Sequence, residues 1–101
     1  MRGDVWWFEP PHARRRAVVI LTRDEVIPHL NHLLAAPTTT RIRSIPTEVE
    51  LDQRDGMPAE CVISLDNLLP VRRAFLTDHL TTLHSTKMAE VCRALARAVA
   101  C

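Results

Sequence analysis

The sequence predicts a mainly β fold that ends in one C-terminal α-helix. Several short runs rich in apolar and β-branched residues lie between residues 4 and 83, separated by breaks that contain proline, glycine or charged residues. After residue 85 the apolar residues recur at helical spacing. Short strands followed by one amphipathic helix indicate a small, curled antiparallel sheet or barrel that the helix plugs or flanks.

Three strands are predicted in the first half of the chain. Asp4–Phe8 is a short aromatic run that stops at Pro10 and Pro11. A loop with the sequence HARRR follows, and Ala17–Leu21 is then a nearly continuous apolar run, typical of a strand that is buried on both faces. His32–Thr40 is the third predicted strand.

The second half contains further strands and the helix. Thr47–Leu51 alternates cleanly, so Val49 and Leu51 are expected to point inward. The Asp-Gly pair at residues 55–56 signals a turn, and residues 70–78 are ambiguous between a loop and a short helix. Two more strands are predicted at Cys61–Leu65 and His79–Leu83.

The terminal helix is expected to begin at Ser85, a residue type that favours the N-cap position. The apolar residues that should face the core are Met88, Val91, Cys92, Leu95 and Val99.

Composition narrows the class of protein. A chain of 101 residues with 47% hydrophobic residues suits one globular domain, here residues 1–101. Its three cysteines are an odd number without C-x-x-C spacing, which argues against a disulfide framework or a zinc site. The N-terminus lacks the apolar stretch of a signal peptide, and no run approaches the ~20 apolar residues of a membrane span. A cytoplasmic protein that has no zinc site and does not bind a membrane is therefore expected.

The charge distribution says more than the net charge of +1. Residues 1–46 hold seven arginines against four acids, residues 47–70 hold six acids against one arginine, and residues 71–101 are basic again. Such segregation favours a local basic surface on a nearly neutral protein, although a solvated surface of mixed charge is the alternative.

One stretch combines hydroxyl and guanidinium groups. In AAPTTTRIRS, three threonines end an apolar run, and Arg41 and Arg43 occupy alternate positions that would share one face of a strand. This combination suits an anion such as phosphate.

Five segments in register carry a resemblance to a known family. They are RGDVWWFEP, RRRAVVILTRDE, LLAAPTTTRIRSIPTEVEL, CVISLDNLLPV and the helical MAEVCRALARAVA. Together they resemble the MazF/PemK toxin endoribonucleases of type II toxin–antitoxin systems over nearly the whole chain. The sequence departs from the family pattern at Ala17, where proline is usual, and at Thr81, where glycine is usual.

The resemblance implies both a fold and an activity. The fold would be an SH3-like antiparallel β-barrel with a C-terminal helix, and the protein would form a homodimer. The activity would be sequence-selective cleavage of single-stranded mRNA without a metal or cofactor. The partner would be a cognate antitoxin with an acidic, disordered tail that covers the RNA site.

The resemblance also assigns roles to residues of this chain. Arg16 and Thr38 match the catalytic arginine and hydroxyl of the family, Asp66 matches a carboxylate of some members, and His12 lies in the loop where relatives place a proton-transfer residue. Arginine suits a phosphate with spreading charge, and histidine side chains titrate near neutral pH. The residues expected to bind RNA are Arg14, Arg15, Thr39, Thr40, Arg41 and Asn67.

Two questions stay open at this point. Trp6 and Trp7 are adjacent and should face opposite sides of a strand, so one belongs to the core while the other could stack on a base or lie in a dimer interface. The alternative function is that of a CcdB-like toxin, which poisons a topoisomerase without cutting RNA, or of a protein-interaction barrel. The first of these needs a C-terminal Trp-Gly contact, whereas this chain ends in ARAVAC.

Overall fold

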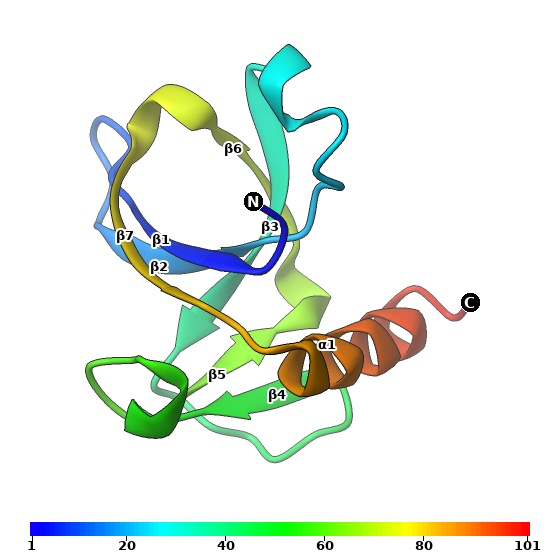
Figure 1. The fold of residues 1–101 in the computed structure, drawn as a ribbon. Coiled ribbons are helices and arrows are strands. Elements are labelled where there is room, and N and C mark those ends of the chain that lie inside the picture. The colour runs from blue at the N-terminus through cyan, green and yellow to red at the C-terminus, as the bar shows by residue number, and fades with distance from the viewer.

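A computed structural model describes residues 1–101, which form seven strands, four short 3-10 turns (η1–η4) and one α-helix (Figure 1). The strands are β1 (Asp4–Phe8), β2 (Arg16–Ile20), β3 (His32–Thr39), β4 (Glu48–Leu51), β5 (Cys61–Ser64), β6 (Leu69–Arg72) and β7 (Leu76–Thr82). Helix α1 (Ser85–Ala98) packs against β4 and the turn η3 (Leu65–Asn67). No helix is both long enough and apolar enough to cross a membrane.

The sheet is antiparallel throughout and strongly curved. Its hydrogen-bonded order is β4-β5-β3-β2-β1-β7, and β6 pairs with β3 beside this path. The long strand β3 explains the curvature, because its first half pairs with β6 while Thr38 and Thr39 pair with β5. The predicted mainly β fold with one terminal helix is confirmed, although the outer edges of the two end strands, β4 and β7, pair with no strand and the ring does not close.

Two apolar clusters occupy the two faces of the sheet. In β2, Ala17 and Val19 point into the larger cluster, which also contains α1, and Val18 and Ile20 point into the smaller one. This alternation confirms a strand buried on both faces. Trp7 packs against the larger cluster and Trp6 against the smaller, so the adjacent tryptophans do face opposite sides.

Several predicted details were wrong at element ends. The ambiguous residues 70–78 form most of β6, the short turn η4 (Arg73–Phe75) and the start of β7, which begins three residues before the predicted His79. Ser85 is already the first residue of α1, and the cap residue His84 makes no side-chain hydrogen bond to the helix end.

The buried stripe of α1 also differs from the prediction. It consists of Met88, Val91 and Ala94, whereas Cys92 and Val99 are exposed. Ala94 keeps the threefold spacing of the stripe and is small enough to approach the sheet closely, whereas the prediction rested on larger apolar residues.

Candidate functional site

The predicted catalytic arginine and hydroxyl lie on neighbouring strands. Arg16 is the first residue of β2, and its exposed guanidinium forms no ion pair within the chain. Thr38 lies near the end of β3, where its Oγ1 donates a hydrogen bond to the carbonyl oxygen of Ala17 at 3.0 Å. Antiparallel pairing of Val18 with Pro37 fixes this arrangement, so Thr38 is held next to the residue that follows Arg16.

Two open hollows meet at this point. The first, of about 640 Å³, lies between the loop that carries Arg14 and Arg15, the end of β3, and residues 57–61. The second, of about 510 Å³, lies between β3, the loop after it, and residues 64–69. Arg16, Thr38 and Thr39 line both hollows. A linear ligand that runs from one hollow into the other would therefore pass directly over these three side chains.

The first hollow combines cations with an aromatic wall. Arg14, Arg15 and Thr40 line it, and the Arg15 guanidinium lies 3.9 Å from the ring centroid of Trp7. Such a cation–π contact holds the arginine over the indole face. A flat base could share this wall, because aromatic and guanidinium planes both stack on bases.

Cys61 also lines the first hollow, but its thiol is poorly suited to act as a nucleophile. Burial raises the pKa of the Cys61 thiol, and the negative charge of Asp55 raises it further. The thiolate is the reactive form, so this side chain stays protonated and unreactive at neutral pH.

The second hollow contains the predicted carboxylate. Asp66 lies in η3 (Leu65–Asn67), and its Oδ2 accepts a hydrogen bond from the Thr47 hydroxyl at 2.5 Å. Asn67 donates to the Ser64 hydroxyl at 2.7 Å. Both side chains are thus held in place by neighbours, and Asp66 keeps its second carboxylate oxygen for a ligand.

The loop after β3 differs from the sequence expectation. Strand β3 ends at Thr39, so Arg41 and Arg43 do not lie on a strand. The Glu48 carboxylate instead accepts hydrogen bonds from the backbone N–H groups of Arg43 and Ser44, at 2.9 and 3.1 Å, and thereby folds the loop back. Both arginines still line the second hollow.

Nine of the ten residues singled out in the sequence line one or both hollows. These are Arg14, Arg15, Arg16, Thr38, Thr39, Thr40, Arg41, Asp66 and Asn67. His12 lines neither: it lies in the turn after β1 with a φ of 64°, and its side chain is exposed. Arg43, which the sequence groups with Arg41, also lines the second hollow. Trp7 and the wall made by Met57 and Pro58 line the first hollow but were not among the predicted site residues.

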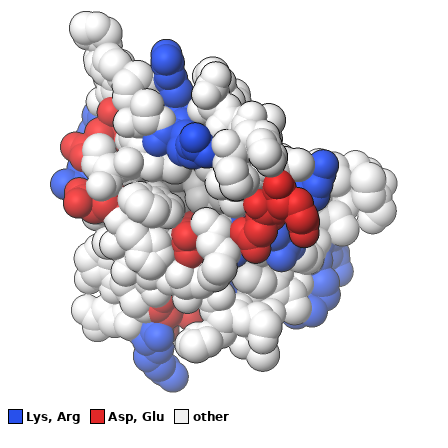
Figure 2. All heavy atoms as spheres, turned by 45° about the horizontal axis from the view of Figure 1, so that its top comes forward, with Lys and Arg blue, Asp and Glu red and all other residues white.

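Charged side chains are dispersed over the face of the molecule drawn in Figure 2. Figure 2 shows the cationic and anionic side chains in separate small groups on the face drawn, without a basic surface that covers it. Arg14, Arg15, Arg16, Arg41 and Arg43 nevertheless gather along the two hollows. No group of three or more His, Cys, Asp or Glu side chains is positioned to hold a metal ion.

A small curved β-sheet with a terminal helix, and hollows lined by arginines and hydroxyl groups, is the arrangement expected for the MazF/PemK class of toxins that the sequence resembles. Residues 1–99 match the model of the PemK-like, MazF-like toxins of type II toxin–antitoxin systems. The chain is 42% identical to the probable endoribonuclease MazF5 of Mycobacterium tuberculosis over an alignment of 101 positions that covers 99% of this chain and 93% of that protein. This chain belongs to the PemK/MazF toxin family.

Solved structures agree with this assignment. The Mycobacterium tuberculosis toxin MazF-mt6 superposes with a TM-score of 0.88 at 29% identity, over 96% of each chain. A mycobacterial endoribonuclease solved in complex with its cognate antitoxin superposes with a TM-score of 0.88 at 24% identity, over 99% of this chain and 94% of that one.

Proposed function

We propose that this chain is the toxin of a type II toxin–antitoxin pair and acts as a metal-independent, sequence-selective endoribonuclease on single-stranded mRNA, which inhibits translation and growth. The observation that carries the proposal is the position of Arg16 and Thr38 where the two hollows meet, with Asp66 in the second hollow. Relatives named as endoribonucleases support it.

The chemistry can be assigned to the chain's own groups. The ribose 2′-oxygen attacks the adjacent phosphorus, the bond from phosphorus to the 5′-oxygen breaks, and a 2′,3′-cyclic phosphate and a 5′-hydroxyl result. The free carboxylate oxygen of Asp66 takes the 2′-hydroxyl proton. Arg16 stabilises the charge on the phosphorane, because its planar fork can bind two phosphate oxygens at once.

Thr38 and His12 complete the proposed catalytic set. Thr38 hydrogen-bonds the phosphate by turning its hydroxyl proton from Ala17 toward a non-bridging oxygen, since a hydroxyl has only one proton to donate. His12 is the candidate acid for the leaving 5′-oxygen. Its loop already brings Arg14 and Arg15 to the first hollow, so movement of that loop on RNA binding would bring the imidazole closer.

The remaining groups would bind nucleotides on either side of the scissile phosphate. Arg14, Arg15 and Thr40 would contact one strand segment in the first hollow, and Thr39, Arg41 and Asn67 another in the second. Phosphate contacts would supply affinity, while the walls formed by Trp7 and Met57 would select bases.

The same basic hollows suit an acidic antitoxin tail, which would exclude RNA by covering Arg14–Arg16 in the cytoplasm. We also expect a homodimer, because the half-buried Trp6 borders an apolar hollow lined by Ile27, Leu33 and Leu76. Burying such a surface against a second copy would stabilise both chains. Sedimentation at micromolar concentration tests this expectation, and a monomer would contradict it.

The activity is tested by incubating the purified chain, residues 1–101, with an mRNA in EDTA and mapping the ends of the products. Discrete fragments with 5′-hydroxyl ends are expected. Intact RNA in the presence of folded protein would contradict the nuclease proposal and favour a non-catalytic toxin or interaction barrel.

A further inference from the structure

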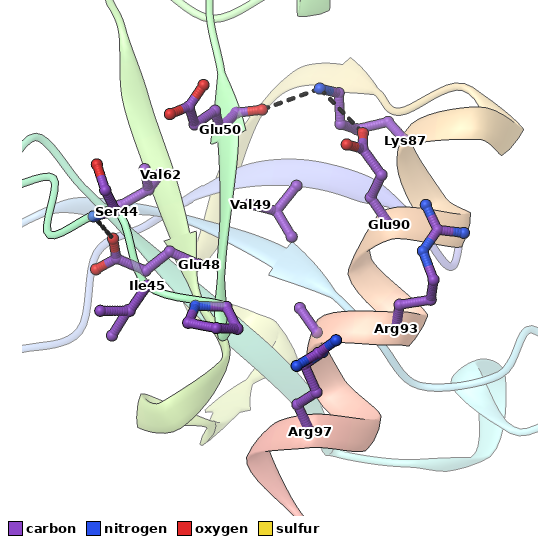
Figure 3. A pocket seen from close by; sticks show the side chains of 12 residues that line it. Ser44, Ile45, Glu48, Val49, Glu50, Val62, Lys87, Glu90, Arg93 and Arg97 are labelled. Carbon is purple, nitrogen blue, oxygen red and sulfur yellow. Dashed lines mark hydrogen bonds and ion pairs between the residues drawn. The ribbon is translucent and has the colours of Figure 1, made fainter.

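A further groove lies between α1 and the outer edge of β4 (Figure 3). It shares Glu48 with the second hollow and no residue with the first. Its volume is about 590 Å³. Val49 of β4 and Ala94 of α1 contribute buried apolar side chains to it, and Ile45 forms part of its rim. None of the residues assigned above to RNA cleavage or RNA binding lines this groove.

The groove carries two unpaired positive charges. Arg93 and Arg97 line it from successive turns of α1, and neither forms an ion pair or side-chain hydrogen bond in the chain. Lys87, by contrast, is engaged by the Glu50 carbonyl oxygen at 3.0 Å and the Glu90 carboxylate at 3.2 Å.

The acidic side chains near the groove leave these two charges unopposed. Glu90 pairs with Lys87, and the Glu48 carboxylate accepts the backbone N–H groups of Arg43 and Ser44. The Glu50 carboxylate points away from α1 (Figure 3). Arg93 and Arg97 are therefore free to bind an anionic partner.

The backbone of β4 offers a second binding element. β4 is an end strand of the sheet, so its outer edge pairs with no other strand. The Thr47 carbonyl oxygen accepts a hydrogen bond from the Leu65 N–H at 3.0 Å, so every second residue from Thr47 onward bonds to β5. The N–H and C=O groups of the residues between them, Glu48 and Glu50, therefore point away from β5. The Glu48 N–H already donates to the Ile45 carbonyl oxygen, and the Glu50 carbonyl oxygen already accepts from the Lys87 ammonium group. The Glu48 carbonyl and the Glu50 N–H therefore remain for an added strand.

The spacing of the arginines matches an extended peptide. Residues four apart on a helix are separated by about 6 Å along the axis, and residues two apart on a strand by about 6.6 Å. Two carboxylates in an acid-x-acid pattern on an added strand would share the face that α1 covers and would reach Arg93 and Arg97 together. The middle residue would face the side of Glu50, where a third acid would be repelled.

We propose that the groove between α1 and β4 is a docking site for an extended acidic peptide segment of another protein, which adds a strand to β4 and places an Asp/Glu-x-Asp/Glu pair on Arg93 and Arg97. Main-chain hydrogen bonds give such strand addition its affinity, and the charged pair gives it specificity. This site is independent of the proposed cleavage of RNA.

The test uses a fluorescein-labelled, end-capped nonapeptide with Asp-Val-Asp at its centre and β-branched neighbours. Fluorescence anisotropy should show saturable binding to the full chain. Replacing both aspartates by asparagine should weaken binding about tenfold or more, because each charge-assisted hydrogen bond is lost. In NMR spectra of the chain, the Glu50 amide should shift and gain protection from exchange.

Variants of the chain separate this site from the RNA site. R93A/R97A should weaken peptide binding at least about tenfold and leave RNA cleavage unchanged, whereas R14A/R16A and the exposed control R54A should leave peptide binding unchanged. The proposal is overturned by a peptide that does not bind, that binds R93A/R97A as well as the wild type, or that binds through Arg14 and Arg16. It is also overturned if R93A/R97A changes RNA affinity or the oligomeric state, since RNA or a second copy would then be the occupant.

Discussion

The Thr38 hydroxyl donates its proton to the carbonyl oxygen of Ala17 across 3.0 Å, which places it beside the strand that begins with Arg16. Before RNA binds, this proton is therefore already engaged. The site is held in place by a backbone carbonyl rather than by another side chain, and a phosphate must compete with that carbonyl for the proton.

The first prediction follows from this contact. Thr38→Ser keeps the hydroxyl and should retain most RNA cleavage, whereas Thr38→Val keeps the shape and loses the donor. The valine variant should cleave about 10²-fold more slowly, toward the lower end of the effect of losing one oxyanion donor. The measurement is the initial cleavage rate per folded molecule of each variant. Equal rates for the serine and valine variants would show that Thr38 serves packing only.

Arg16→Ala should reduce cleavage by about 10³-fold, because no other group lining both hollows carries a permanent positive charge. Thermal stability should change little, since the guanidinium is exposed and unpaired within the chain. Arg23→Ala is the matched control: it removes an exposed arginine whose only ion pair, with Glu25, is long at 3.9 Å. A folded Arg16→Ala protein that cuts at the wild-type rate would remove Arg16 from the site.

The third prediction concerns pH and the buried Asp4. Burial raises the pKa of Asp4, but the positive N-terminal amino group, the Thr82 hydroxyl and His79 outweigh this effect and hold the pKa below its ordinary value of 3.8. A lowered folded-state pKa means that Asp4 stabilises the fold above pH 3.8 and that this contribution is lost as the pH falls through the folded value.

Asp4→Asn should therefore lower the free energy of unfolding by about 1–3 kcal/mol at pH 7, because it weakens hydrogen bonds to a charged, buried acceptor. The difference from wild type should shrink below pH 3.8. Urea unfolding across this pH range measures it, with the exposed Asp78→Asn as the control. A difference that does not depend on pH would contradict the assignment.

Gly56→Ala tests the turn directly before Met57, a residue that lines the first hollow. Gly56 has a φ of 95°, and an added Cβ would lie 2.4 Å from the Thr81 Oγ1. The left-handed backbone should cost about 1–2 kcal/mol, and the crowding about 1–3 kcal/mol more.

A double-mutant cycle separates these two effects. In the background of Thr81→Gly, the Gly56→Ala substitution should cost only the backbone term, because the crowded side chain is gone. Chemical denaturation gives the four free energies, and an equal cost in both backgrounds would show that the loop relaxes away from Thr81.

Much of the fold followed from short-range patterns. The alternation in Val49 and Leu51 and the apolar run of β2 predicted their burial correctly, because a strand's side chains repeat every two residues. Other features depend on the folded sheet. The burial of Ala94 requires α1 to approach the sheet closely, and the strand residues within 70–78 form β6 and β7 by pairing with β3 and β1, which are distant in sequence.

The candidate site also has a part that local sequence predicts and a part that only the folded chain reveals. Arg16 and Thr38 could be identified from local segments that resemble the family, and the structure places both beside the hollows. The wall at Met57, the stack of Arg15 on Trp7 and the contact of Thr47 with Asp66 could not, because each joins residues whose contact depends on the folded sheet.

The most direct test of the central claim compares two RNA oligonucleotides that span one mapped cleavage site, identical except for a single 2′-deoxy nucleotide on the 5′ side of the scissile phosphate. If the 2′-oxygen is the nucleophile and Asp66, Arg16 and Thr38 serve that attack, the all-ribose strand is cut in EDTA and the deoxy strand stays intact at that bond. Cleavage of both strands at equal rates would contradict the account.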